Sequence, residues 1–282
     1  MEAVPDHFES ALDGAQFRAL AGVDGVELYR AQLVHHAFEP HTHEGYGLGV
    51  IDTGVERFRY KGSDHLAPAG SLVLMNPDTL HTGQAATQAG WRYRMAYVHP
   101  ELMRAVTGRP PGLFAEPVRF DPARAAAVAQ VLQALWEPGP ELHTQGLLLT
   151  LLDLLQPLSE ARATPTPSGA PRFDRVLACM QDRLADQLRL AELAQEAQLS
   201  PYHFLRSFKR EFHVTPQQML MAFRLAQAKR LLARGQRPAD VAAACGLTDQ
   251  AHLTRCLRQR YGVTPGQYQA QLGTRPAKHS RA

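Results

Sequence analysis

Short apolar runs fill the first hundred residues, and within them hydrophobic and polar positions often alternate. The turn-forming triplets DTG at 52–54 and PAG at 68–70 separate several of these runs. The runs occupy residues 26–34, 46–51, 55–60, 71–75 and 92–98. A period of two places successive side chains on opposite faces of a strand. The pattern predicts the hairpins of a small antiparallel barrel or sandwich.

The pattern changes after Pro117, where apolar residues recur every three or four positions. Segments 121–136 and 140–158 each open with an acid or a proline, and the second carries an almost continuous leucine face. That face either packs against the β-rich part or forms a helical dimer interface, and the sequence leaves both open. We therefore assign residues 1–158 to one domain, with 121–158 as candidate dimerisation helices.

A change of composition divides the chain. Residues 159–171 are rich in proline, serine, threonine and alanine without an apolar period, which is typical of a linker. Residues 1–171 carry 12 basic and 19 acidic side chains, whereas 172–282 carry 18 basic and 8 acidic ones. A basic domain behind an acidic one indicates a polyanionic partner, with nucleic acid the first candidate.

An internal repeat organises residues 172–282. The stretch HFLRSFKREFHVTP at 203–216 aligns with HLTRCLRQRYGVTP at 252–265 at an offset of 49, and the shorter segments before them align at 48. Each unit reads as a short helix, a tight turn and a longer helix, which is the layout of a helix-turn-helix. The predicted inward stripes are Phe204, Phe208 and Phe212 in the first unit and Leu253, Leu257 and Tyr261 in the second.

One long helix is predicted between the two units, over 216–234. At ~1.5 Å per residue it spans about 28 Å, near the ~34 Å that separates successive major-groove openings on one face of DNA. A single chain could therefore present both longer helices to one double-stranded site.

The segment 173–268 resembles the DNA-binding domain of the AraC/XylS family of transcription regulators. The resemblance is carried by AQAKRLL at 226–232, by LAELAQEAQLSPYHFLRSFKREFHVTP in the first unit and by VAAACGLTDQAHLTRCLRQRYGVTPGQY in the second. It implies that Tyr202, Leu205 and Arg206 face bases in one groove and that Gln250, Ala251, His252 and Arg255 do so in the next. His203 lies on the same outward face, and Lys209, Arg210 and Arg258 are expected to hold phosphates.

Two histidines, His41 and His43, stand one residue apart beside a predicted strand, where both would aim at one spot. With the segments 68–81 and 90–98, they resemble the cupin-type sensor domain that precedes this DNA-binding module. In metal-binding cupins three histidines and a glutamate hold the ion; His41, His43 and His81 match the histidines, but Gly47 and Leu48 stand where the glutamate is expected.

Three interpretations of these histidines stay open: a zinc or iron site, imidazoles that contact an organic ligand, or structural side chains. We predict a ligand site of His41, His43, Tyr46, His81 and Tyr93 with no metal and no cofactor, and keep His41, His43 and His81 as the alternative metal site. Trp91, Tyr93, Met95 and Tyr97 alternate with Arg92 and Arg94, and the sequence does not decide which set faces inward.

The fold class predicted is α+β with two domains: a cupin-like β-barrel followed by a helical pair, then an all-α domain with two helix-turn-helix units joined by a long helix. The function predicted is a transcription regulator, not an enzyme, whose small organic effector binds the barrel and alters operator binding or contact with RNA polymerase. The alternative is a cupin metalloenzyme, of the dioxygenase or isomerase kind, fused to a DNA-binding module. A homodimer is expected.

Cysteine usage and hydropathy predict the compartment. The chain has three cysteines, without a CxxC pair, so they are predicted to be reduced thiols. No run reaches the roughly 18 apolar residues that cross a bilayer. The sequence therefore predicts a cytoplasmic protein with no membrane partner.

Overall fold

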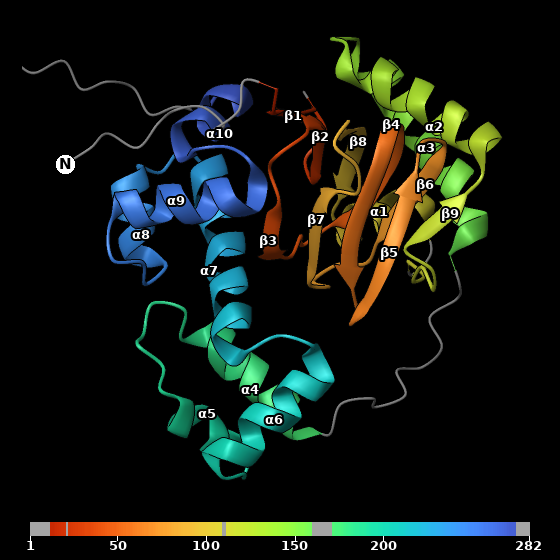
Figure 1. Ribbon diagram of the computed structural model, residues 1–282. Helices are drawn as coiled ribbons and strands as arrows, with labels where there is room; N and C mark the ends of the chain where they lie inside the picture. The colour runs from red at the N-terminus through yellow and green to blue at the C-terminus, as the bar shows by residue number, and fades with distance from the viewer. Residues whose placement is uncertain (1–11, 21, 109–110, 160–170, 275–282) are drawn as a thin grey trace, which may run out of the picture. The chain divides into compact units, whose positions relative to one another are not determined.

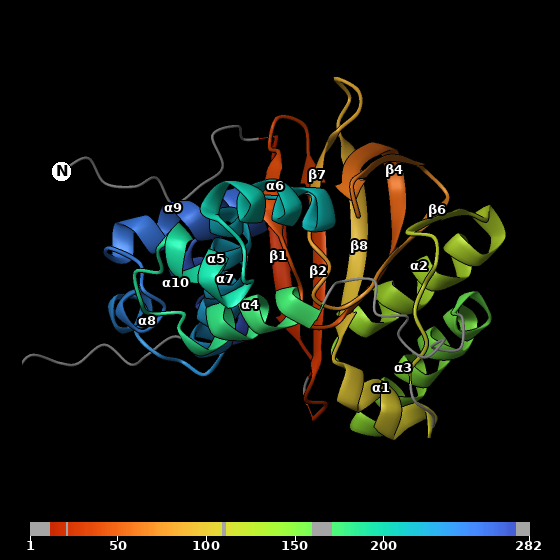
Figure 2. The ribbon, with the colours of Figure 1, turned by 90° about the horizontal axis from the view of Figure 1, so that it is seen from below.

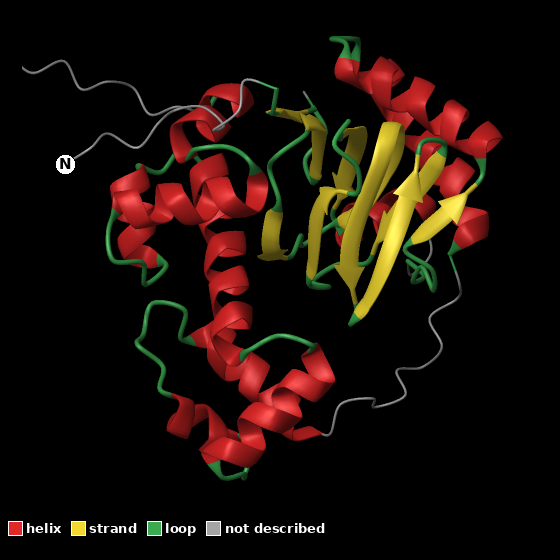
Figure 3. Ribbon diagram, viewed as in Figure 1, coloured by secondary structure: helices red, strands yellow, loops and turns green. Residues whose placement is uncertain are grey.

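The computed structural model describes residues 12–20, 22–108, 111–159 and 171–274 (Figure 1). The chain divides into two compact units, one holding the described residues up to Ser159 and the other those from Pro171. Strands gather in the first unit, and the second is helical (Figure 3). The predicted two-domain α+β class is confirmed. Residues 160–170 of the predicted linker lie outside the described residues.

The strands of the first unit are β1 (Gly14–Ala19), β2 (Val26–Leu33), β3 (Phe38–His41), β4 (Tyr46–Tyr60), β5 (Ser63–Pro68), β6 (Ser71–Met75), β7 (His81–Ala85), β8 (Trp91–Val98) and β9 (Val118–Phe120). The predicted runs coincide with β2, β6 and β8. The runs 46–51 and 55–60 both belong to β4, so the turn predicted at DTG (52–54) is wrong. The helices of this unit are α1 (Pro100–Thr107), α2 (Pro122–Trp136), α3 (Glu141–Leu155) and the short 3-10 helix η1 (Gln156–Leu158).

The strands pair in the order β1-β2-β8-β4-β6-β9, and β4 also pairs with β5 and with β7, which in turn pairs with β3. All of the pairs are antiparallel. Among the described strands, β1 and β9 end the order without pairing with each other, so the sheet of the predicted cupin-like barrel is open and not closed into a ring. The physical reason is that β1 pairs only with β2 and β9 only with β6, so no hydrogen-bonded ladder closes the ring.

A register shift in β4 decides which side chains face inward. Its ladder with β8 shifts between Ile51 and Thr53, so Asp52 is an extra residue of a β-bulge. Before the bulge, Leu48 packs in the core cluster beneath the helices; after it, Glu56 and Phe58 are buried on the other face. The bulge therefore changes the phase of the alternation within a single strand.

The leucine face of the helical pair packs against the sheet. Leu148, Leu151, Leu152 and Leu155 of α3 join one buried cluster with residues of α2, β2, β4, β6 and β8, and Figure 2 shows α2 and α3 along one side of the sheet. Leu142 and Leu149 remain 81% and 51% exposed. One face of α3 therefore belongs to the domain core, and a second apolar strip stays at the surface.

The second unit is built of seven described helices. They are α4 (Pro171–Asp182), α5 (Leu190–Glu196), α6 (Pro201–Phe212), α7 (Pro216–Ala233), α8 (Pro238–Ala244), α9 (Gln250–Tyr261) and α10 (Pro265–Leu272). The predicted inward stripes are confirmed for Phe204, Phe208, Leu253, Leu257 and Tyr261, which are almost fully buried. The long helix α7 contacts α6 of the first helix-turn-helix and both α8 and α9 of the second.

The repeat also appears in the hydrogen bonds that begin the helices. Ser200 and Asp249 cap α6 and α9, each accepting from the backbone N–H three residues on. Thr215 and Thr264 open α7 and α10 with the same capping box. Each pair is separated by the offset of 49 seen in the sequence, so the duplication preserved local hydrogen bonding as well as the apolar stripe.

The ends of α6 and α9 differ in one respect. Both are closed by a residue in the left-handed region, His213 with φ 59° and Gly262 with φ 73°. Glycine adopts this conformation without a Cβ penalty, whereas histidine pays one.

We expect His213→Gly to raise the free energy of unfolding of the helical unit by about 0.5–1 kcal/mol, because the strain outweighs the added freedom of the unfolded chain. Gly262→Ala should lower it by about 1–2 kcal/mol. Urea unfolding followed by circular dichroism at the helix band measures both. A His213→Gly variant less stable than the wild type would contradict the assignment.

Candidate ligand-binding site and nucleic-acid interface

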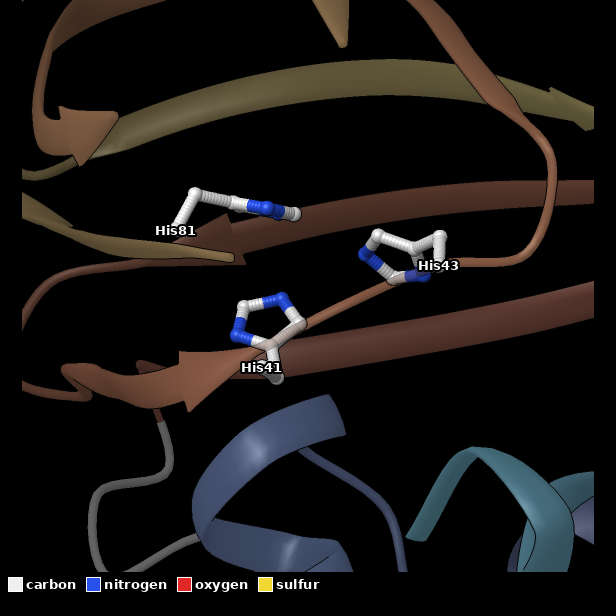
Figure 4. A group of neighbouring side chains, drawn as sticks. All are labelled: His41, His43 and His81. Carbon is white, nitrogen blue, oxygen red and sulfur yellow. The ribbon is translucent and has the colours of Figure 1, made fainter. Parts of the chain in front are cut away.

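Three buried histidines converge in the β-rich unit (Figure 4). His41 ends β3, His43 follows in the loop before β4, and His81 begins β7, where it lies opposite His41 in the ladder. One ligand nitrogen from each lies within 4.8 Å of the others. Antiparallel pairing of two short strands thus brings together residues that are forty positions apart.

Backbone carbonyls orient two of the rings. His41 Nδ1 lies 2.8 Å from the Glu39 carbonyl oxygen, and His81 Nδ1 lies 2.9 Å from that of Thr79. Since a carbonyl only accepts, Nδ1 carries the proton in both rings, and each Nε2 presents a lone pair. Burial lowers the pKa of His81 to about 4, despite the opposing effect of the Thr79 carbonyl, so this imidazole is neutral at pH 7.

An aromatic chain, formed by Tyr97, Tyr29, Tyr93, Trp91 and Phe38, leads from one histidine back to another. The ring centroids are separated by 3.9 Å (His43–Tyr97), 6.4 Å (Tyr97–Tyr29), 5.6 Å (Tyr29–Tyr93), 5.9 Å (Tyr93–Trp91), 6.4 Å (Trp91–Phe38) and 5.7 Å (Phe38–His41). His41 and His43, 5.0 Å apart, close the circuit. The interior therefore offers flat apolar faces beside one polar cluster.

A buried carboxyl group shares this interior. Glu56 of β4 is 6% exposed, and its Oε1 lies 3.0 Å from the place that a Cβ on Gly83 would take. Gly83 lies two residues after His81 on β7, so a Cβ on Gly83 would be on the same face of the strand as the His81 side chain. Burial raises the pKa of Glu56 to about 8, so the group is largely protonated at neutral pH and can donate a hydrogen bond.

The structure brings four of the five predicted ligand residues to the inward face. His41, His43 and His81 cluster, and Tyr93 lies in the aromatic chain. Tyr46 lies elsewhere: it belongs to the core cluster beneath the helices and meets the ring of Phe114 edge-on at 6.0 Å. Sequence reasoning missed Glu56, because a charged residue in the run VERFRY reads as solvent-facing.

The arginines of β8 point away from the aromatic chain. Arg94 donates to Asp52 at 2.6 Å and 2.9 Å and to the Ala129 carbonyl of α2 at 2.9 Å. Arg92 lies 3.9 Å from the same carboxylate. These side chains tie β8, the β4 bulge and α2 together.

In the helical unit, α6 and α9 present the predicted polar residues outward. Tyr202 is 68% exposed, and His203, Arg206, Lys209 and Arg210 are exposed with it, while Leu205 is half-buried. On α9, Gln250 and Arg255 are exposed and Ala251, His252 and Arg258 are half-buried. Each helix therefore has one apolar face in the domain core and one face of hydrogen-bond donors and cations.

Two domain families match this chain: the AraC-like ligand binding domain over residues 25–152 and a helix-turn-helix domain over 193–271. The chain belongs to the AraC family of transcription regulators. Its relatives include the HTH-type transcriptional regulator YbfI of Bacillus subtilis (strain 168), 28% identical over 81% of this chain and 86% of YbfI. The activator RhaS of Klebsiella pneumoniae (strain 342) is 23% identical over 87% and 92%.

Similar solved structures share the AraC-type fold. Unsaturated fatty acid bound wild-type ToxT from Vibrio cholerae strain SCE256 gives a TM-score of 0.57 at 10% identity, covering 90% of this chain and 97% of ToxT. ToxT from Vibrio cholerae O395 gives 0.52. The likeness concerns the architecture.

None of the described helices of this chain is long and apolar enough to cross a bilayer.

We expect Glu56→Gln to change how stability depends on pH. The folded pKa of about 8 lies above the ordinary value of 4.5, so the stabilisation from the bound proton is complete below pH 4.5 and is lost as the pH rises through 8. Relative to Glu56→Gln, the wild type should lose a few kcal/mol across this window, at about 1.4 kcal/mol per pKa unit.

Tryptophan fluorescence can follow this unfolding, because both tryptophans, Trp91 and Trp136, lie in the β-rich unit. The exposed Glu116→Gln serves as the matched control and should leave the profile unchanged. A difference between wild type and Glu56→Gln that is flat with pH would contradict the buried, protonated carboxyl.

Proposed function

We propose that this protein is a ligand-responsive, sequence-specific DNA-binding regulator of transcription. The observation that carries the proposal is the duplicated helix-turn-helix, in which α6 and α9 keep matching caps, matching buried stripes and outward cations. Membership of the AraC family supports a regulator over the alternative of a cupin metalloenzyme.

We propose that some residues of α6 and α9 contact DNA bases and that others contact phosphates. Arg206 and Arg255 are exposed and stand where their planar guanidinium groups can pair with guanine O6 and N7. Tyr202, His203 and Leu205 on α6 and Gln250, Ala251 and His252 on α9 complete the base-facing sets. Lys209, Arg210 and Arg258 lie toward the C-terminal ends of their helices and contact phosphates.

For the effector we propose the interior of the β-rich unit. His41, His43, His81 and Tyr93 face it, together with Glu56, which donates or accepts a hydrogen bond. A small organic ligand held there changes operator occupancy only if it binds the DNA-competent arrangement with a different affinity from the other. Contact with RNA polymerase and a cytoplasmic location belong to the same proposal.

The test begins with selection of binding sites from random duplex DNA by the full-length chain. A regulator enriches one motif with two contacts spaced about one helical turn apart and binds it at least 10³-fold more tightly than random DNA. Enrichment of no motif, with equal affinity for all duplexes, would refute sequence-specific regulation.

Arg255→Ala should weaken binding to the selected site by about 1–3 kcal/mol and leave the affinity for random DNA nearly unchanged. The matched control Arg210→Ala should weaken both by a similar factor and reduce the salt dependence, because a phosphate contact reads no sequence. Fluorescence anisotropy titrations measure all four affinities. Equal loss on both DNAs in Arg255→Ala would count against base contact.

We also propose a homodimer that forms through the exposed strip of α3. Leu142 and Leu149 lie seven residues apart and are 81% and 51% exposed, so they share one helix face. Changing both to Asp should halve the mass measured by sedimentation while the circular dichroism stays unchanged. Leu66→Asp, at a comparably exposed leucine on β5, is the control. A wild-type mass of one chain at every concentration would overturn the dimer.

A further inference from the structure

Three arginines, Arg30, Arg92 and Arg94, gather on the helix-facing side of the sheet, away from the histidine cluster. On β2 and β8 this side begins as core, because Leu28 and Ala96 pack in the cluster beneath the helices. Side chains two positions apart on a strand share a face, so Arg30 and Arg94 follow on the same side. The apolar face of the sheet therefore gives way abruptly to cations.

The strand register brings these charges together. Arg30 and Arg94 lie directly opposite each other in the ladder of β2 and β8, and Arg92 is the diagonal neighbour of Arg30. Directly opposite Cβ atoms are about 4.5–5.5 Å apart, and long side chains also reach their diagonal neighbours. Because like charges in these positions destabilise a strand pair, an anion between them would turn a repulsive arrangement into an attractive one.

Only part of this charge is compensated. Asp52 accepts from Arg94 at 2.6 Å and 2.9 Å and lies 3.9 Å from Arg92 Nε. Among the described residues it is the one carboxylate that forms an ion pair with these arginines, which leaves two positive charges without a counter-charge. The guanidinium groups cannot lose their protons at neutral pH, so the excess charge is permanent.

Arg30 is held in place without a ligand. Its Nε donates to Gln16 Oε1 at 2.7 Å, and its guanidinium carbon lies 4.2 Å from the centroid of the Trp136 ring. Within the described part of the chain its two terminal amino groups make no hydrogen bond, so about four N–H donors remain for a ligand. A planar group that is already positioned loses little freedom when it binds an oxyanion.

The arginines line a cavity of about 570 Å³, a size typical of small-molecule sites. The other polar side chains that line it are Gln16, Gln32, Asp52 and Gln133. Amide groups both donate and accept hydrogen bonds, so they suit the hydroxyl groups of an organic ligand. Trp91 and Tyr93 alternate with Arg92 and Arg94 along β8, so the sheet separates this cavity from the aromatic interior.

We propose that this arginine cavity binds the phosphate group of a small organic molecule. A phosphate monoester carries a charge of about −1.5 to −2 at neutral pH and three acceptor oxygens, which matches the uncompensated charge. One arginine fork satisfies a planar carboxylate, whereas arginines on two strands suit a group whose oxygens point in several directions. The site lies outside the interior proposed for the effector and adds a second ligand to that proposed function.

A ligand in the arginine cavity would act on the contact between the sheet and α2. Arg94 donates to the Ala129 carbonyl of α2 at 2.9 Å, and Arg30 stacks on Trp136 at the end of the same helix. Both arginines would then hold the phosphate and α2 at once. Binding therefore couples β2 and β8 to the helical pair.

The first experiment measures the affinity of the full-length chain for inorganic phosphate by isothermal titration calorimetry at constant ionic strength. In Arg92→Gln, which changes a side chain that is 54% exposed, the affinity should fall about tenfold or more, because a charge-assisted hydrogen bond is lost. Arg59→Gln removes the same charge from an exposed position of β4 and should bind like the wild type. No binding by the wild type, or equal affinity in all three proteins, would overturn the site.

Two further titrations test the chemistry of recognition. Arg30→Lys keeps the cation and loses the planar fork, so its affinity for phosphate should fall while its circular dichroism matches the wild type. Succinate, whose two carboxylates are planar, should bind the wild type more weakly than phosphate. Unchanged affinity in Arg30→Lys, or succinate binding as tight as phosphate, would contradict a phosphate site.

Binding to the selected operator is measured separately. Sequence-specific DNA binding by a protein that binds no phosphate refutes the arginine cavity as a site and leaves the regulator intact. Phosphate binding that is sensitive to Arg92→Gln, in a protein without a preferred operator, supports the site and refutes the regulator. The two proposals therefore fail independently.

Discussion

The architecture of the β-rich unit depends on a single strand that must satisfy hydrogen bonds on both edges along its length. β4 pairs with β5, β6, β7 and β8, and it is the strand through which all the other pairings connect. Because buried backbone groups need partners, its fifteen residues fix where four neighbours run. The candidate ligand site depends on these pairings, because His81 lies on β7, Tyr93 lies on β8 and Glu56 lies on β4 itself.

In the helical unit the organising constraint is local and is applied twice. The second helix of each helix-turn-helix motif, α6 or α9, begins at a side-chain cap, buries one apolar stripe and presents its remaining face outward. Since caps and stripes are encoded within a few residues, the duplication could be recognised from the sequence and matches the structure in detail. The long helix α7 packs against both helix-turn-helix motifs, so both motifs share one core within the helical unit.

Prediction from sequence succeeded where the signal is periodic and failed where tertiary pairing decides. The strands β2, β6 and β8, the helical pair, the helix-turn-helix helices and their buried stripes follow from patterns of two and of three to four residues, whereas the shorter strands β1, β3, β5, β7 and β9 were not predicted. The direction of Tyr46 does not follow, because YGLGVI is buried on both faces and has no alternation to indicate one. Alternation does place Glu56 on the face of Phe58 and Tyr60, opposite Arg57, so the signal lay in the run VERFRY and was overridden by the charge of the residue. The pairing that sets His81 against His41 joins residues far apart in the chain, and no local pattern indicates it.

The bulge at Asp52 limits how the length of β4 can vary. Upstream of it the even-numbered residues face the helices, and downstream they face the interior, so the loss of one residue at the bulge would turn Glu56 outward and Arg57 inward. Insertions and deletions in this strand are therefore tolerated only in pairs, whereas the turns around it are free of such a parity rule. Over evolutionary time, the spacing between Asp52 and Glu56 should vary less than the identity of the residues between them.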